Sequence, residues 1–263
     1  MHAFLTGSTG FIGRRLATIL RERGNTVTVA KRGDDHFRLM QDAKPDVVFH
    51  LAAHYVRDHE PVDVARLVQS NVEYGAMILE AMRMHGVRRI VTASSLWTQP
   101  VPVNLYAATK LAFNALVDYY TNTYSILATT LLLGDTYGPE DRRGKIIYRM
   151  FEAIIRDEAL PMTPGEQILD LTHVDDVCLA FLHAATLPCL EHDTWAVHAG
   201  ERLTLRALAA RVEQAAGKPL KAVWGALPYP PAQVMNPMTS PNLPGWAPSH
   251  PLLDWLSRLA KEI

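Results

Sequence analysis

Hydrophobic and polar positions alternate along the first part of the chain in blocks that predict strand, helix and strand in turn. A short apolar run, "HAFLTG", ends in glycine. The next segment is "FIGRRLATILRERG", in which Ile12, Leu16, Ile19 and Leu20 recur at helical spacing before Gly24. "NTVTVAKRG" then has the pattern of a second strand. This order is the opening of a parallel sheet.

The same alternation continues to about residue 139. Strands are predicted in "DVVFHLAA" (46–53), "VRRIVTASS" and "ILATTLLLGDTYGP", and helices in residues 64–86 and in "YAATKLAFNALVDYYTNTY". We therefore predict an α/β fold, a doubly wound parallel (Rossmann) sheet, over residues 1–139, with 168–198 returning to it.

The pattern becomes irregular over residues 140–263. Short helical stretches such as "KIIYRMFEAIIRD" alternate with the proline-rich "ALPYPPAQVMNPMTSPNLPGWAP". Proline blocks helix interiors and sheet hydrogen bonds, so we expect loops and short elements in a smaller C-terminal substrate lobe. A linker or disordered tail is the alternative for the proline-rich stretch, but Trp224, Tyr229, Leu243 and Trp246 give it more apolar surface than a tail carries.

Composition narrows the class of protein. The 263 residues are 48% hydrophobic and 20% charged, as in globular proteins, and the net charge of -1 gives no basic surface for nucleic acid or an anionic membrane. Cys178 and Cys189 fit neither a disulfide framework nor metal-ligand spacing, so both are interpreted as packing residues in a reducing compartment. No signal-peptide pattern or membrane-length apolar run is present. We expect a cytoplasmic protein without a metal.

The glycines of "TGSTGFIG" follow the first strand and open the first helix, the context that a dinucleotide-binding loop requires. Glycine lets the backbone approach a pyrophosphate, which then accepts from the free N–H groups at the helix N-terminus. A tight turn with close helix packing is the alternative. The residues expected to hold the dinucleotide here are Gly7, Thr9, Gly10, Phe11, Ile12 and Gly13.

The end of the second strand favours NADP(H). An NAD site usually offers a carboxylate there to the ribose hydroxyls, whereas this chain has Lys31 and Arg32, with Asp34 and Asp35 only later. Two cations can pair with the 2′-phosphate of NADP. The alternative is a solvated strand end.

Tyr106 and Lys110 in "NLYAATK" lie one helical turn apart on the same face. A neighbouring ammonium would lower the phenol's pKa and make tyrosine a usable general acid. Ser95 ends the preceding strand, at the edge of a parallel sheet where ligands bind. We expect Ser95 to hydrogen-bond the substrate oxygen, Tyr106 to move the proton and Lys110 to bond the nicotinamide ribose. Taken alone, a tyrosine packed on a lysine stem is the simpler interpretation.

Five motifs together resemble the extended short-chain dehydrogenase/reductase superfamily, in its nucleotide-sugar-modifying epimerase/dehydratase branch. They are "TGSTGFIG", "DVVFHLAA", "NVEYGAMILEA", "YAATK" and "DLTHVDDV". The resemblance implies cofactor contacts at Leu51, Ala52, Ala53 and Lys110, and a supporting role for Asn71 at the cofactor site. It implies the catalytic triad Ser95, Tyr106 and Lys110. It also implies a structural role for Asp175.

Within that branch, "NLYAATKLAF" and "DTYGPEDRRGKI" are similar to reductases of nucleotide-linked 4-keto-6-deoxy sugars, of the CDP-abequose synthase type. This similarity implies NADPH-dependent reduction of a C4 ketone, a nucleotide-linked sugar as the partner and a homodimer as a possible assembly. Pro230 stands where relatives often carry an arginine for the diphosphate, and "EDRRGK" has a solvated loop as its alternative. The expected substrate contacts are Ser95, Trp97, Thr136, Arg142, Arg143 and Lys145.

Two other functions stay open at this point. One is a nucleotide-sugar 4-epimerase with tightly bound NAD, and the other is a non-catalytic dinucleotide sensor that binds a partner protein. Ser95 and Tyr106 are only 11 positions apart, which shortens the loop beside the sugar and favours exchange of cofactor over retention. The intact Ser95, Tyr106 and Lys110 argue against the sensor.

Overall fold

The computed structural model describes residues 1–188 and 192–262, so Cys189 lies outside the described residues. The chain forms two compact units. The first contains Met1–Leu133, Val177–Val197 and Thr239–Trp246, and the second contains Gly134–Asp176, His198–Met238 and the chain from Ala247.

The first unit is built on a six-stranded sheet with the order β2-β1-β3-β4-β5-β9, in which every neighbouring pair is parallel. The strands are β1 (His2–Thr6), β2 (Thr26–Ala30), β3 (Val47–His50), β4 (Arg89–Ser95), β5 (Leu127–Leu133) and β9 (His192–Val197). The order reverses between β1 and β3, and open parallel sheets bind ligands outside the carboxyl ends of the strands at such a point. The predicted doubly wound parallel sheet is confirmed.

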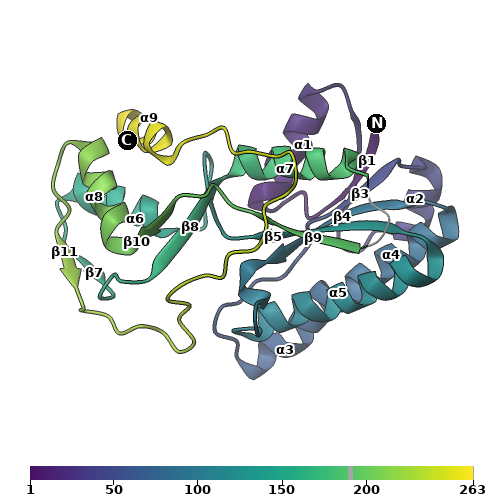
Figure 1. Cartoon of the computed structure of the whole chain (residues 1–263), viewed down its shortest axis with the longest axis horizontal. Helices are drawn as coiled ribbons and strands as arrows, with labels where there is room; N and C mark the ends of the chain where they lie inside the picture. Colours follow the sequence, from purple (N-terminus) through teal and green to yellow (C-terminus); the bar gives the residue numbers. More distant parts are fainter. Residues whose placement is uncertain (189–191, 263) are drawn as a thin grey trace. The chain divides into compact units, whose positions relative to one another are not determined.

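Helices cover both faces of this sheet, with α1 and α7 on one face and α4 and α5 on the other (Figure 1). Their bounds are α1 (Phe11–Glu22), α2 (His36–Ala43), α3 (Pro61–Val68), α4 (Tyr74–His85), α5 (Leu105–Tyr124) and α7 (Val174–Thr186). Because both faces are covered, central strands bury every side chain, as β3 does throughout. On the α4 and α5 face, Phe4, Val48 and Ile90 pack in one cluster with Ile78 and Phe113.

The helix predicted over residues 64–86 is interrupted in the structure. A π-helical turn, Gln69–Glu73, separates α3 from α4, and it carries Asn71. Gly86 ends α4 as predicted, in the left-handed region with φ +71°. π-Helical turns insert one residue into a helix and are frequent at functional sites, which makes Asn71 a residue to follow.

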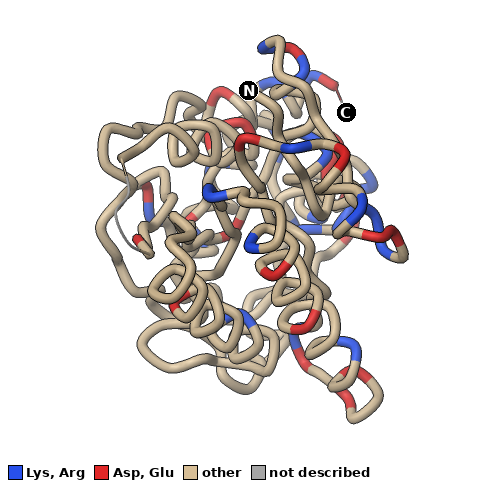
Figure 2. Tube along the Cα trace, turned by 90° about the vertical axis from the view of Figure 1, so that its right-hand side faces the viewer, with Lys and Arg blue, Asp and Glu red and all other residues tan. Residues whose placement is uncertain are grey.

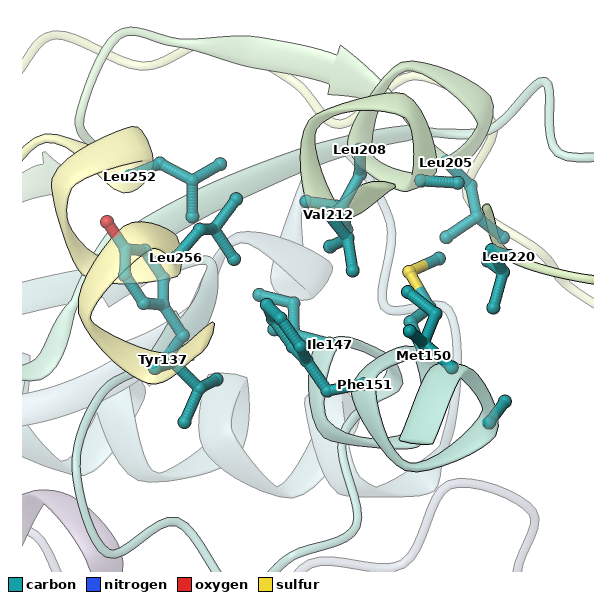
Figure 3. Packing of buried hydrophobic residues seen from close by; sticks show 14 of the residues in the cluster. Tyr137, Ile147, Met150, Phe151, Leu205, Leu208, Val212, Leu220, Leu252 and Leu256 are labelled. Carbon is teal, nitrogen blue, oxygen red and sulfur yellow. The ribbon is translucent and has the colours of Figure 1, made fainter. Parts of the chain in front are cut away.

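The second unit has its own core. Its three-stranded sheet has the order β10-β8-β6, and a two-stranded sheet pairs β11 with β7. Side chains of three helices meet beside Tyr137 to form a buried apolar cluster (Figure 3). The elements are β6 (Asp135–Tyr137), β7 (Leu160–Met162), β8 (Ile168–His173), β10 (Arg202–Thr204), β11 (Ala222–Trp224), α6 (Ile146–Arg156), α8 (Leu205–Ala216) and α9 (Leu252–Glu262).

The unit boundaries differ from the predicted ones at 139 and 168–198. β6 pairs with β8 and not with the central sheet, so the first unit ends at Leu133 and resumes only at Val177. Part of the proline-rich stretch also belongs to the first unit. Leu243 is buried, and the backbone N–H of Ala196 in β9 donates to Pro241 at 2.9 Å. The tail interpretation is therefore wrong for residues 239–246.

Two predictions from composition can be followed in the structure. Acidic and basic residues are interspersed along the trace in Figure 2 and do not separate by sign in that view. Cys178 is buried, as expected for a packing residue. None of the helices within the described ranges is long and apolar enough to cross a membrane.

Candidate active site

The glycine loop approaches the end of β3 so closely that side chains would not fit. A Cβ on Gly7, whose φ is +76°, would lie 2.6 Å from the backbone nitrogen of Ala52. A Cβ on Gly13 would lie 2.1 Å from the carbonyl oxygen of Gly7. Glycine is thus required at both positions, by backbone conformation and close approach at Gly7 and by helix packing at Gly13.

A pocket of about 1030 Å³ opens in the first unit beside this loop. Its walls come from the glycine loop, the ends of β2 and β3, and α3 with the π-helical turn. The predicted cofactor residues that line it are Gly7, Thr9, Gly10, Lys31, Arg32, Leu51, Ala52 and Ala53. Phe11, Ile12, Gly13, Asn71 and Lys110 lie outside its lining, so their contact with a cofactor stays a prediction. The volume, the glycine cradle and the N-terminus of α1, which the N-cap residue Gly10 does not cap with a side chain, fit a dinucleotide.

The cations and carboxylates at the end of β2 have different surroundings. Lys31 and Arg32 both line the pocket. Asp34 accepts from the backbone N–H of Lys31 at 2.7 Å, and Asp35 caps α2 by accepting from that of Arg38 at 3.1 Å. All four residues line the pocket, but each carboxylate already compensates a backbone donor.

Asn71 is completely buried and holds the loop after β3 by bonding both the backbone N–H and the backbone carbonyl of His54. Its Oδ1 accepts from the backbone N–H of His54 at 2.7 Å, and its Nδ2 donates to the His54 carbonyl at 3.0 Å. Nδ2 also donates to Thr109 Oγ1 at 2.9 Å, and Thr109 lies on α5 one residue before Lys110. The supporting role implied for Asn71 therefore has a physical form, a clamp between the loop and α5.

Ser95 ends β4 and Tyr106 lies in the first turn of α5, in the same unit. Ser95 Oγ accepts from the backbone N–H of Trp97 at 3.2 Å, so its own hydroxyl hydrogen can still be donated to a ligand. Trp97 and Tyr106 are connected through Tyr55, whose ring centroid lies 6.1 Å from the ring of Trp97 and 5.0 Å from that of Tyr106. These contacts gather the end of β4 and the start of α5 around one ring.

The pKa of Tyr106 differs from the expectation. Burial raises the pKa of Tyr106 to about 12, and Tyr55 adds to the same direction. The predicted lowering by Lys110 is wrong for the protein alone, because removal of water from the phenol dominates. Tyr106 is therefore a neutral phenol at pH 7 and carries the proton that an acid needs.

Lys110 is 1% exposed, and burial lowers its pKa to about 8. No carboxylate of the described residues pairs with it, so nothing compensates the lost water. The neighbouring His50 is also buried; burial, and then the charge of Lys110, lower the pKa of His50 to about 3. His50 Nδ1 bonds Thr6 Oγ1 at 3.0 Å, which leaves Lys110 as the single cation of this pair at pH 7.

Three of the expected substrate residues of the second unit, Thr136, Arg143 and Lys145, already have partners within it. Arg143 donates to both carboxylate oxygens of Asp141, at 2.6 and 2.7 Å, and to the backbone carbonyl of Thr136 at 2.8 Å. Lys145 pairs with Asp135 at 3.0 Å, and Arg142 is exposed. Substrate contact by Thr136, Arg142, Arg143 and Lys145 stays a prediction.

The structural role implied for Asp175 stays a prediction, and its neighbour Asp176 has a clear one. Asp176 is fully buried, and it accepts from the backbone N–H and hydroxyl of Ser249, both at 2.9 Å. It also accepts from His250 Nδ1 at 2.7 Å and from the backbone N–H of His250 at 3.0 Å. The sequence pattern does not reveal that the second of these adjacent aspartates is the fully buried one.

Comparison with known proteins gives the chain a family. The sequence model of the "NAD dependent epimerase/dehydratase family" matches residues 3–193. The chain belongs to this family. Within the family, it is 30% identical over 207 residues to CDP-abequose synthase of Yersinia pseudotuberculosis, which covers 70% of this chain and 72% of that protein. It is 26% identical over 263 residues to UDP-glucose 4-epimerase of Mycolicibacterium smegmatis, covering 83% and 84%.

Solved structures of family members share the fold. UDP-glucose 4-epimerase from Thermotoga maritima, solved with UDP-glucose, matches with a TM-score of 0.87 at 21% identity, covering 99% of this chain and 98% of that one. UDP-glucuronic acid 4-epimerase from Bacillus cereus, solved with UDP-glucuronic acid and NAD, also matches with a TM-score of 0.87 at 21% identity, covering 100% and 99%. The resemblance to extended short-chain dehydrogenases/reductases that modify nucleotide sugars is confirmed.

Sequence reasoning missed two residues of this site. His50 was seen only as part of a strand, and Tyr55 was not considered. Tyr55 follows "HLAA" in a loop, where no local pattern indicates that its ring would meet Tyr106.

Proposed function

We propose that the protein is an NADPH-dependent reductase of the C4 ketone of a nucleotide-linked 4-keto-6-deoxy sugar, with Ser95, Tyr106 and Lys110 as the catalytic residues. The observation that carries the cofactor choice is the pair Lys31 and Arg32 lining the pocket while Asp34 and Asp35 accept from backbone N–H groups. The 30% identity to a CDP-abequose synthase supports the substrate class.

The residues of the first unit divide the reaction among them. Bound NADPH would supply the hydride for the carbonyl carbon. Tyr106 donates its phenolic proton to the carbonyl oxygen, and Ser95 donates a hydrogen bond to the same oxygen. Lys110, with a pKa of about 8, is mostly charged at pH 7 and stabilises the phenolate that Tyr106 becomes. In this scheme, the groups that act on the carbonyl oxygen and on the phenolate all come from β4 and α5.

The proton donor is tested with Tyr106→Phe, which removes only the hydroxyl. We expect turnover to fall by roughly 10²–10⁴-fold while the dissociation constant for NADPH stays within about twofold. Tyr119→Phe is the matched control, because Tyr119 is an exposed tyrosine on the same helix. A Tyr106→Phe enzyme that turns over within about tenfold of the parent would show that another group is the acid.

The cofactor choice is tested by titrating NADPH and NADH separately. One charge-assisted bond to the 2′-phosphate contributes about 1.5–3 kcal/mol, so NADPH should bind at least about tenfold more tightly. The double variant Lys31→Ala/Arg32→Ala should lose that preference with little change for NADH. Arg38→Ala, at an exposed position of α2 outside the pocket lining, should keep it. Equal affinities in the parent protein would overturn the assignment.

A nucleotide-sugar 4-epimerase is the second candidate, favoured by the 26% identity to a UDP-glucose 4-epimerase over 83% of the chain. The two activities differ in cofactor balance. A reductase consumes one NADPH per sugar, whereas an epimerase needs no net cofactor and retains NAD through purification. Loss of NADPH absorbance in proportion to sugar reduced supports the reductase. Inversion at C4 without added cofactor would establish the epimerase instead.

A further inference from the structure

Tyr55 presents a large aromatic surface directly beside the proposed proton donor. It lies in the loop after β3, and its side chain is 50% exposed. Its ring meets that of Tyr106 nearly at right angles, at 81° and 5.0 Å, and lies at 45° and 6.1 Å from that of Trp97. The exposed ring of Tyr55 is therefore a direct neighbour of the proposed proton donor.

The backbone around Tyr55 is fixed on both sides. On one side, Asn71 holds both the N–H and the carbonyl of His54, at 2.7 and 3.0 Å. On the other side, Asn104, which caps α5, donates through Nδ2 to the carbonyl of Arg57 at 3.3 Å. A ring on so short and doubly anchored a segment keeps its place relative to Tyr106. This arrangement gives a reason for Asn71 to lie in a π-helical turn, because the clamp positions Tyr55.

Aromatic side chains next to a reacting carbonyl favour an apolar neighbour. C5 of a pyranose is bonded directly to C4, so the substituent on C5 lies within a few ångströms of the group that protonates the C4 oxygen. A methyl group placed against an aromatic ring loses only unfavourable contact with water. A hydroxymethyl group placed there loses hydrogen bonds to water that a ring does not replace.

We propose that Tyr55 and Trp97 form an apolar wall that packs against the C5 substituent of the sugar and selects a methyl over a hydroxymethyl group at that position. This inference rests on the proposed ketoreductase function. Tyr55 is a specificity-determining residue in this scheme, and Asn71 is the positioning residue behind it.

The test compares two substrates that differ at C6 alone. The 4-keto-6-deoxyglucose and 4-ketoglucose conjugates of CDP, dTDP and UDP are each offered with NADPH, and kcat/KM is measured for every pair. We expect the parent enzyme to prefer the 6-deoxy sugar by about ten- to hundredfold, the range for one small group in an apolar site. Tyr55→Ala should reduce that ratio to within about threefold, mainly through a higher KM for the 6-deoxy sugar. Tyr55→Phe should keep it.

Tyr119→Ala serves as the matched control. Tyr119 is 51% exposed and also lies edge-on to other tyrosine rings, at 5.4 Å from Tyr120 and 5.8 Å from Tyr124. The preference should be unchanged in this variant. A folded Tyr55→Ala enzyme with the parent's preference would overturn the inference and leave the reductase standing.

Failure of the proposed function would look different, because the parent enzyme would reduce neither sugar. In that event, saturation-transfer NMR with the corresponding 4-hydroxy-6-deoxy conjugates decides the question without turnover. The C6 methyl protons should receive strong saturation from the parent protein and much less from Tyr55→Ala. Equal saturation transfer to the C6 methyl protons in both proteins would refute the proposed contact between Tyr55 and this methyl group.

Discussion

Among the buried ionisable groups, one in each unit makes a useful pair, because their charges have opposite surroundings. Asp176 in the second unit is fully buried, and four donors of Ser249 and His250 surround its carboxylate. Lys110 in the first unit is 1% exposed and lacks a carboxylate partner among the described residues. A compensated charge connects parts of the chain, whereas an uncompensated charge costs stability and is retained where a ligand can use it.

Both pKa values are lowered, which favours the ionised form of the aspartate and disfavours that of the lysine. Burial alone would raise the pKa of Asp176, but the hydrogen bonds from His250 and Ser249 outweigh it and lower that pKa. For Lys110 burial acts unopposed and lowers the pKa to about 8. Ionised Asp176 is therefore stabilised by folding, and ionised Lys110 is destabilised by it.

The largest expected effect is the loss of the compensated charge. Asp176→Asn should lower the free energy of unfolding by about 3 kcal/mol, because it removes one partner from a buried network of charged hydrogen bonds. Asp175→Asn is the matched control and should cost less than about 1 kcal/mol, the usual worth of a charge at a helix N-terminus. Urea denaturation measures both, and hydrogen exchange in Leu252–Glu262 should accelerate only for Asp176→Asn. Equal losses in the two variants would remove the distinction between these aspartates.

Lys110→Met is expected to stabilise the protein, in contrast to Asp176→Asn. Replacing the uncompensated ammonium by an apolar chain of similar length should raise the free energy of unfolding at pH 7 by on the order of 1–3 kcal/mol, while catalysis is lost. Lys44→Met, at an exposed position of the same unit, should stay within about 0.5 kcal/mol of the parent. A Lys110→Met protein that is less stable than the parent would mean that a compensating partner for this ammonium exists.

The pH dependence gives a smaller effect per pH unit and sharpens the comparison. Between about pH 8 and 10.5, Lys110 has lost its proton in the folded protein but keeps it in the unfolded chain. The unfolded state then binds more protons, so stability rises with pH in this window, by up to about 1.4 kcal/mol per unit. The difference in unfolding free energy between the parent and Lys110→Met should shrink accordingly. A constant difference over this window would show that Lys110 is not buried as a cation.

At the acid end the same reasoning applies to Asp176 with the opposite sign. Its folded-state pKa is lowered from 3.8, so its contribution is complete above that value and is lost as the pH falls through the folded-state pKa. The parent should therefore lose stability relative to Asp176→Asn only below about pH 4, where the unfolded-state carboxyl begins to protonate. Urea denaturation at pH 3 and pH 6 gives the two differences to compare.

Features that depend on local periodicity could be predicted from the sequence. The strand and helix order, the glycine loop and the position of Ser95 before the Tyr106 helix follow from apolar spacing and from the motif "TGSTGFIG". The π-helical turn could not be predicted, because the apolar spacing of residues 64–86 does not mark where a single extra residue is accommodated. Nor could the burial of Lys110, since lysine is ordinarily exposed and only packing shows otherwise.

Contacts between segments that are distant in the sequence could not be predicted either. Tyr55 meets Tyr106 only because the loop after β3 and the start of α5 come together in space. The pKa of Tyr106 was predicted in the wrong direction because the sequence shows the neighbouring charge but not the removal of water. The buried contacts of Asp176 depend on the path of residues 249 and 250, far along the chain.

The order of strands also determines when the protein can fold as it leaves the ribosome. The sixth strand of the central sheet is His192–Val197, and its outer edge is paired by residues near Asn242. The first unit therefore cannot complete its sheet until the residues near Asn242 have been translated. Residues 134–176 emerge earlier, but their core waits for Leu252–Glu262. The first unit needs residues 239–246 and the second needs Leu252–Glu262, so the nascent chain must keep its unfinished sheet edges from aggregating until these segments have been synthesised.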